Sequence, residues 1–209
     1  MPPIPPRSLR RRSFLTAAVP WLVLAMALLP QAAQAHVEGG QASGLAAGLL
    51  HPLSGPDHMV AMVAVGLWGA VLGPPAIWVL PVAFPLVMAF GGLLGLLGVP
   101  VPAVEVGIAV SGVVMGLMVL LEQRPPLWLA ATIVAVFAVF HGHAHGTELP
   151  AGGNALLYSL GFVVATGLLH LLGILLGELR RWPGGRRLVQ AAGAGVALTG
   201  LMFLVRAVA

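Results

Sequence analysis

The segment that decides the fold is LWLAATIVAVFAVFHGHAHGTE, residues 127–148. Its first fourteen residues carry no charge, and His141, His143, His145 and Glu148 follow them. An apolar segment of roughly 20 residues is long enough to cross a bilayer as one helix. Three imidazoles and a carboxylate are costly to place in lipid, so their position at the end of such a helix indicates a function.

The whole chain has the composition of a membrane protein. Of its 209 residues, 59% are hydrophobic and only 8% are charged, whereas a soluble domain has about 25% charged residues. The apolar runs are continuous rather than alternating, which argues against a β-barrel. We therefore expect an all-α fold, a polytopic bundle of transmembrane helices in a lipid bilayer.

The excess of basic residues reflects membrane topology rather than nucleic-acid binding. Four of the ten basic residues lie within the first twelve positions, namely Arg7, Arg10, Arg11 and Arg12, and Lys is absent. Most of the others cluster in one loop, so no nucleic-acid partner is expected. Cys is also absent, which excludes disulfides and thiolate metal sites.

Residues 1–35 have the three parts of a secretory signal peptide. The basic segment MPPIPPRSLRRR precedes the apolar segment SFLTAAVPWLVLAMALLP, and QAAQA then ends in the A-x-A pattern of a cleavage site. We expect cleavage after Ala35, which leaves a membrane domain of residues 36–209 that begins with His36. The alternative is a retained first transmembrane helix. The short match of RRSFL to a twin-arginine signal does not decide the export route.

Six spans are expected in the membrane domain. Pro- and Gly-containing breaks place them at about 44–73, 76–97, 103–121, 127–149, 154–177 and 188–208. With His36 outside, the loops after the third and fifth spans face the cytoplasm. These two loops hold five Arg and the outer loops hold none, as the positive-inside rule requires. Both mature termini are thus expected on the outer face of a bacterial inner membrane.

The fourth span carries one half of an expected metal site. If it is helical, His141, His145 and Glu148 lie on one face, because they are spaced by four and three residues. Gly142 and Gly146 leave room for another helix to approach closely. Since the fourth span runs outwards, we expect this stripe in the outer half of the membrane.

The first span carries the other half, in HPLSGPDH, residues 51–58. Its prolines and glycine disfavour regular helix, so we expect a broken helix there. Such a break lets His51, Asp57 and His58 turn towards one point. Glu105, early in the third span, adds a third carboxylate, and His36 would add an α-amine and an imidazole at the outer mouth.

A bound cation would offset the cost of these carboxylates. No Arg or Lys lies within the segments that carry them, and a charge near the bilayer centre costs about 2.5–3.5 kcal/mol on insertion scales. Mixed imidazole and carboxylate ligands suit Ni²⁺, Co²⁺, Zn²⁺ or Fe²⁺, whereas Ca²⁺ and Mg²⁺ prefer oxygen alone. The sequence does not rank these four metals.

Other polar residues have simpler explanations. His143 points away from the stripe of the fourth span, which favours a hydrogen-bonded structural role. His170 lies deeper, in the fifth span, and is as consistent with a satisfied core histidine as with a ligand. Glu122 and Glu178 are expected to be acids at the ends of spans.

HPLSGPDH and FHGHAHGTE resemble the two signature motifs of the HupE/UreJ family, H-x5-D-H and F-H-G-x-A/V-H-G-x-E, without substitution. Members of this family are regarded as nickel or cobalt permeases that often serve hydrogenase or urease maturation. The larger nickel/cobalt transporter family has the spacing H-x4-D-H, which is one residue shorter. The resemblance covers the mature chain and implies metal-handling roles for His51, Asp57, His58, His141, His145 and Glu148, and less directly for His36 and Glu105.

The resulting hypothesis is an inner-membrane permease that imports a divalent transition metal, Ni²⁺ first and Co²⁺ second. We expect no enzymatic activity and no resident cofactor, because the metal is cargo. No nucleotide-binding motif is present, so transport would follow the membrane potential or an ion gradient. The resemblance implies hydrogenase or urease accessory proteins as partners.

Two alternatives remain open at this stage. One is an intramembrane Zn²⁺ hydrolase built from three His, an Asp and Ser54 or Ser111, although HGHAH is not the zincin motif H-E-x-x-H. The other is a metal sensor or metallochaperone that binds the ion without transporting it.

Overall fold

A computed structural model describes residues 44–148 and 154–209, and the described part is helical apart from short connections. Its elements are α2 (Leu45–Ser54), α3 (Pro56–Leu72), α4 (Ala76–Leu96), α5 (Val104–Leu120), α6 (Leu127–Thr147), α7 (Ala155–Glu178), the 3-10 turn η2 (Leu179–Arg181) and α8 (Gly185–Val208). The predicted all-α class is thus confirmed. The expected signal peptide and His36 lie outside the described residues.

Helix length and composition make this a multi-pass membrane protein. Helices α4, α6, α7 and α8 are each long and apolar enough to cross a membrane, and α2 and α3 together pass as one broken span. Helix α5 is apolar but has 17 residues, which is about 26 Å against a hydrocarbon core of about 30 Å. The expected number of six spans therefore stays a prediction.

The first span is broken, as the sequence predicts, and bends by 88° between α2 and α3. The break falls at Gly55, whose backbone is extended, and Pro56 begins α3. Proline is well suited to the first position of a helix, where its missing N–H would have no helical partner. Pro52 does not cause the break, because it lies buried inside α2.

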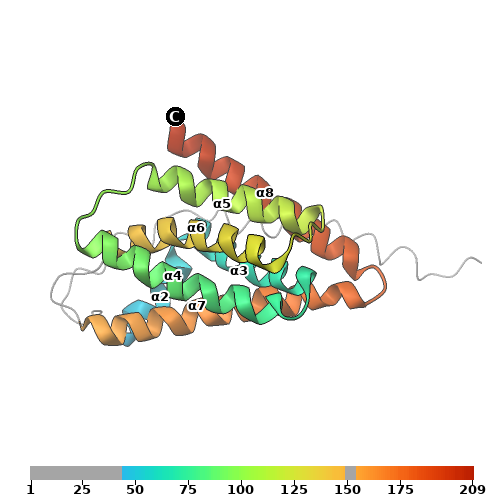
Figure 1. The fold of residues 1–209 in the computed structure, drawn as a ribbon, viewed down its shortest axis with the longest axis horizontal. Helices are drawn as coiled ribbons and strands as arrows, with labels where there is room; N and C mark the ends of the chain where they lie inside the picture. Colours follow the sequence, from blue (N-terminus) through green and yellow to red (C-terminus); the bar gives the residue numbers. More distant parts are fainter. Residues whose placement is uncertain (1–43, 149–153) are drawn as a thin grey trace, which may run out of the picture.

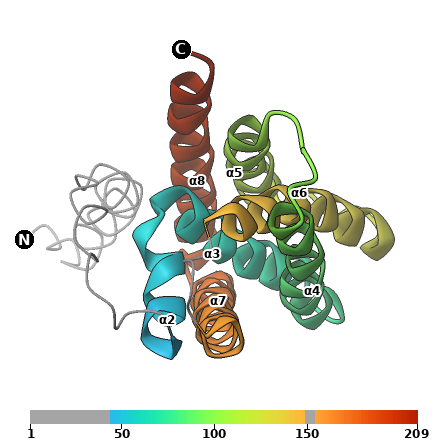
Figure 2. The ribbon, with the colours of Figure 1, turned by 90° about the vertical axis from the view of Figure 1, so that its left-hand side faces the viewer.

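Helix α3 forms the centre of the bundle, with the other helices around it in pairs (Figures 1 and 2). Helix α4 packs on α6, α5 packs on α8, and α7 packs on both α2 and α3. Most residues of α3 are buried, as expected for a helix that is apolar on all sides. The break at Gly55 therefore lies where α3 enters the core.

Glycines allow α4 and α6 to approach closely, as the sequence predicts for α6. A Cβ atom on Gly142 would clash with the backbone carbonyl of Met88, and one on Gly146 would clash with that of Gly92. Backbone therefore packs directly on backbone along this pair of helices, which is typical of helix association in membranes. The contact fixes the part of α6 that carries the histidines.

The expected cytoplasmic loops lie together at one end of the bundle. Glu122, after α5, forms an ion pair of 2.8 Å with Arg186, in the first turn of α8. Glu178, at the end of α7, pairs with Arg181. In Figure 1 the α5–α6 and α7–α8 connections lie at the right, and the α4–α5 loop lies at the left. The two acids are thus at the ends of spans, and the arginine-bearing loops share one side.

Candidate metal site

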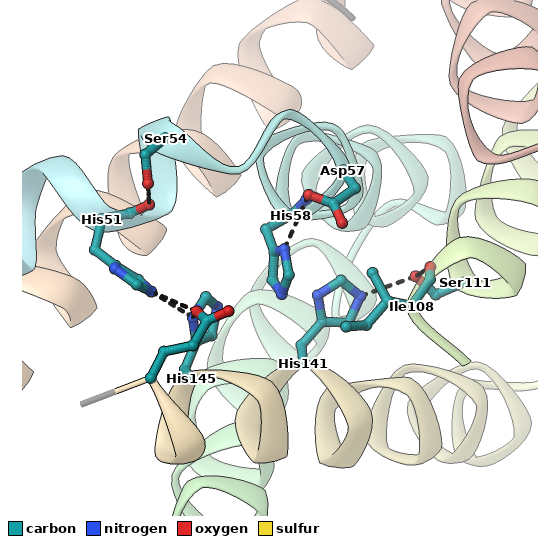
Figure 3. A network of polar contacts seen from close by, with 9 residues as sticks. His51, Ser54, Asp57, His58, Ile108, Ser111, His141 and His145 are labelled. Carbon is teal, nitrogen blue, oxygen red and sulfur yellow. Dashed lines mark hydrogen bonds and ion pairs between the residues drawn. The ribbon is translucent and has the colours of Figure 1, made fainter. Parts of the chain in front are cut away.

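The break in the first span brings its polar residues against the last turns of α6. His51 comes from α2, Asp57 and His58 come from the first turn of α3, and His141 and His145 face them from α6 (Figure 3). On a straight helix Asp57 would lie about 100° round from His58. With the 88° bend between α2 and α3, residues from both parts of the first span face the last turns of α6.

Three residues form what we call the outer group: His51, His145 and Glu148. His51 Nε2 lies 2.9 Å from His145 Nδ1 and 3.3 Å from Glu148 Oε2. One ligand atom from each residue lies within 4.8 Å of the others. Among the described residues, this is the group of three whose donor atoms lie close enough to hold a single ion.

The outer group can be reached from the end of the bundle. The side chain of Glu148 is 57% exposed and that of His51 is 23% exposed, whereas His145 is 10% exposed. The contact with His51 lowers the pKa of the Glu148 carboxyl below its usual value, although partial burial opposes this effect. An ionised carboxylate at the mouth, backed by two imidazoles, is suited to attract a hydrated cation.

A second tier of imidazoles lies behind the outer group. The ring of His58 is 4.4 Å from the ring of His145 and 4.8 Å from the ring of His141, measured between centroids. Figure 3 shows His58 between the two histidines of α6. His58 is 8% exposed and His141 is fully buried. The rings of His51, His145, His58 and His141 therefore form a row, which we call the imidazole file, that leads from the exposed mouth into the core.

Ser111 fixes the tautomer of His141. Its Oγ donates to the backbone carbonyl of Ile108 at 2.6 Å, so the same oxygen can only accept from His141 Nε2, which lies 2.9 Å away. The proton of the imidazole is thus on Nε2, and Nδ1 keeps its lone pair. His141 Nδ1 is buried without a hydrogen-bond partner among the described residues.

Asp57 acts on His58 in the same way. Its Oδ1 lies 3.0 Å from His58 Nδ1 and also accepts the backbone N–H of His58 at 2.9 Å. An ionised carboxylate only accepts, so His58 Nδ1 donates, and in the neutral ring Nε2 keeps its lone pair. That Nε2 is likewise buried without a partner within the described part of the chain. Carboxylate–histidine pairs of this kind orient metal ligands in proteins.

These unpaired ring nitrogens fit a transition-metal ion. A buried polar atom without a partner costs roughly 1–3 kcal/mol, and a neutral imidazole nitrogen is a common ligand of Ni²⁺, Co²⁺ and Zn²⁺. None of the site residues named above is Lys or Arg. No positively charged side chain among them therefore competes with a metal ion for the carboxylates.

The remaining predicted residues are placed differently. Glu105 is exposed in the first turn of α5, and no ion pair or hydrogen bond to its carboxylate is found within the described residues. His143 bonds to the backbone carbonyl of Val99 at 2.9 Å, so it points away from the stripe, as its spacing predicts. His36 lies outside the described residues and its expected role remains a prediction.

Aromatic rings that carry no signal in the sequence line the site. The ring centroid of Phe162 is 4.5 Å from that of His145, and the ring of Tyr158 is 5.6 Å from that of His51. Phe84 lies 5.5 Å from His141. Aromatic residues are ordinary in apolar spans, so only their position in the fold marks them. Ser111 carried a weak signal, as a polar residue in the middle of an apolar span.

Comparison with known proteins gives consistent results. The family described as HupE / UreJ protein matches residues 24–203. Protein HupE from Rhizobium leguminosarum bv. viciae is 49% identical over 182 residues, which cover 87% of this chain and 95% of that protein. No solved structure shows a significant match to this chain.

Proposed function

This chain belongs to the HupE/UreJ family, and from that premise we propose that it is a permease that imports a divalent transition metal across the bacterial inner membrane, Ni²⁺ first and Co²⁺ second. The observation that carries the proposal is the file of donor atoms that begins at the exposed carboxylate of Glu148 and ends at fully buried His141. A protein that only captured an ion at its surface would not need the inner part of this file.

The proposed path starts at the outer group. Glu148 attracts the hydrated ion, and His51 and His145 replace part of its water. The ion then passes to the lone pair of His58 Nε2 and to that of His141 Nδ1. Asp57 and Ser111 hold the proton of each neutral ring on its other nitrogen. Imidazole and carboxylate donors select Ni²⁺ and Co²⁺ over Ca²⁺ and Mg²⁺.

The membrane potential supplies a driving force for import. It contributes about 2.3 kcal/mol per charge per 100 mV, and a divalent ion feels roughly twice that amount. In this proposal the metal is cargo, so the protein has no resident cofactor. Family membership supports a destination in hydrogenase or urease maturation, with accessory proteins of those enzymes as partners.

The hydrolase alternative gains no support from the serines. In that alternative a metal-bound water is the nucleophile, and a serine would line the site. The hydroxyl of Ser111 already donates to the Ile108 carbonyl and accepts the N–H of His141, so it has no proton to offer a substrate. Ser54 donates to the backbone carbonyl of His51 at 2.7 Å. We therefore propose transport rather than an enzymatic function.

Uptake of Ni²⁺, Co²⁺ and Zn²⁺ into proteoliposomes with an imposed potential tests the proposal. The wild-type protein is compared with an Asp57→Asn, His141→Ala double variant. His143→Ala is a matched control, since His143 bonds to the loop carbonyl of Val99. Saturable Ni²⁺ or Co²⁺ uptake that the double variant loses and the control keeps is expected. Binding without uptake by a folded wild-type protein would refute the permease and favour the sensor or metallochaperone.

A further inference from the structure

One more buried histidine has a ring nitrogen that the site described above does not use. His170, in α7, is 1% exposed. Its Nδ1 lies 3.2 Å from the backbone carbonyl oxygen of Pro81, and its Nε2 is buried without a partner among the described residues. The ring therefore has one nitrogen with a structural task and one without.

The hydrogen bond to Pro81 has a clear cause. Pro81 and Pro85 both lie inside α4, and Pro85 has no N–H to donate to the carbonyl four residues before it, which is that of Pro81. A carbonyl only accepts, so His170 Nδ1 is the donor and carries the proton. It follows that His170 Nε2 has a free lone pair, as His141 Nδ1 does.

His170 lies deeper in the bundle than the outer group. The ring of His51 contacts Tyr158 on α7, with 5.6 Å between centroids, and His170 is three helical turns further along the same helix. At 1.5 Å per residue this separation is about 18 Å along α7. The position is therefore on the cytoplasmic side of the imidazole file.

Phe84 lies between the end of that file and His170. Its ring centroid is 5.5 Å from the ring of His141 and 5.5 Å from the ring of His170, and Phe84 is fully buried. Thr166 is one turn before His170 on the same face of α7, and its Oγ1 is also buried without a partner in the described part of the chain. His170 and Thr166 thus place two polar atoms on one face of α7, and the ring of His170 lies next to Phe84.

We propose that His170 Nε2, with Thr166 Oγ1 as a second donor, is an inner metal-binding station that receives the ion from His141 past the ring of Phe84. This inference rests on the proposed transport function and extends it to the inner half of the path. One imidazole and one hydroxyl make a weaker site than the outer group. Weak binding is compatible with conduction, because a transported ion must also be able to leave.

A purely structural histidine predicts a different behaviour from an inner station, and His170→Asn separates the two. The amide nitrogen of Asn takes roughly the place of Nδ1 and can still donate to Pro81, but nothing replaces Nε2. We expect this variant to fold and to bind Ni²⁺ at the outer group like the wild type, while Ni²⁺ uptake into proteoliposomes falls by about tenfold or more. Uptake equal to the wild type would overturn the inner station.

A second pair of variants keeps the test decisive if His170→Asn does not fold. Pro85→Ala restores an N–H for the Pro81 carbonyl, so His170 has no backbone group to satisfy in that background. We expect His170→Leu added to Pro85→Ala to lower uptake relative to Pro85→Ala alone, and equal uptake would overturn the inference. Absence of uptake by the wild type is a separate outcome, which refutes the transport function and the inner station together.

Discussion

His51 Nε2 lies 2.9 Å from His145 Nδ1, although the two residues are 94 positions apart in the chain. The contact joins α2, outside the break of the first span, to the last turn of α6. Glu148 Oε2 approaches the same nitrogen of His51 at 3.3 Å, and α2 turns away from α3 by 88°. The outer group therefore joins the outer part of the broken first span to the end of α6.

Replacement of His51 tests the outer group directly. We expect His51→Ala to lower the affinity for Ni²⁺ by about tenfold or more, equivalent to a loss of at least about 1.4 kcal/mol, because one of three ligands is removed. His143→Ala is the control, since it removes an imidazole of α6 that bonds to the backbone carbonyl of Val99. Equilibrium binding of Ni²⁺ to the purified proteins measures both, and an equal loss in the two variants would contradict the assignment.

Ser111 is expected to act through His141. Ser111→Ala removes the acceptor for His141 Nε2–H, so the ring no longer has a fixed tautomer. We expect Ni²⁺ affinity or uptake to fall by about 10- to 100-fold, as is typical when a residue that hydrogen-bonds to a metal ligand is lost. Ser111→Thr keeps the hydroxyl and should retain most of the function. The ¹⁵N chemical shifts of His141 report the tautomer, and an unchanged tautomer in Ser111→Ala would refute this role.

The local part of the site could be predicted from the sequence. The stripe of His141, His145 and Glu148 follows from helical spacing alone, and the break in HPLSGPDH follows from the chemistry of proline and glycine. The exact place of the break, at Gly55, does not, because Pro52 is accommodated inside α2. The stripe and the break both depend on residues only a few positions apart in the chain. They can therefore be predicted from the sequence alone.

The long-range part of the site required the structure. The contact of His51 with His145 and that of Ser111 with His141 join residues 94 and 30 positions apart. Such pairs depend on which helices pack together and at what rotation, and one sequence does not specify this. Phe84 was missed for the same reason, since its neighbours come from α6 and α7.

The close packing of α4 on α6 makes Gly142 sensitive to substitution. A methyl group there would clash with the carbonyl of Met88, so we expect Gly142→Ala to lower the free energy of unfolding by about 1–3 kcal/mol, as overpacking does. Gly167→Ala is the control, because a Cβ atom at Gly167 meets no atom within 4 Å; it should stabilise the protein slightly, by up to about 1 kcal/mol. Thermal unfolding in detergent compares them, and equal effects would contradict the packing.

The predicted signal peptide can be checked on the mature protein. We expect cleavage between Ala35 and His36, so N-terminal sequencing of the protein from the membrane fraction should begin with His36. A chain that still carries its first 35 residues would show that this segment is a retained transmembrane helix. It would also remove the free α-amine that His36 is expected to add at the outer mouth. Residue 36 would remain outside in both cases, because the segment crosses the membrane once.

The orientation of the bundle can be measured by labelling, because the chain has no Cys. We expect an impermeant maleimide to label Pro102→Cys, in the exposed α4–α5 loop, from the outside of cells with a permeabilised outer membrane. Arg187→Cys, exposed in the first turn of α8, should be labelled only after lysis, since its loop carries the arginines that the positive-inside rule places in the cytoplasm. The reverse pattern would put Glu148 and the outer group on the cytoplasmic side, where the membrane potential would oppose movement of a cation from that group to the other face.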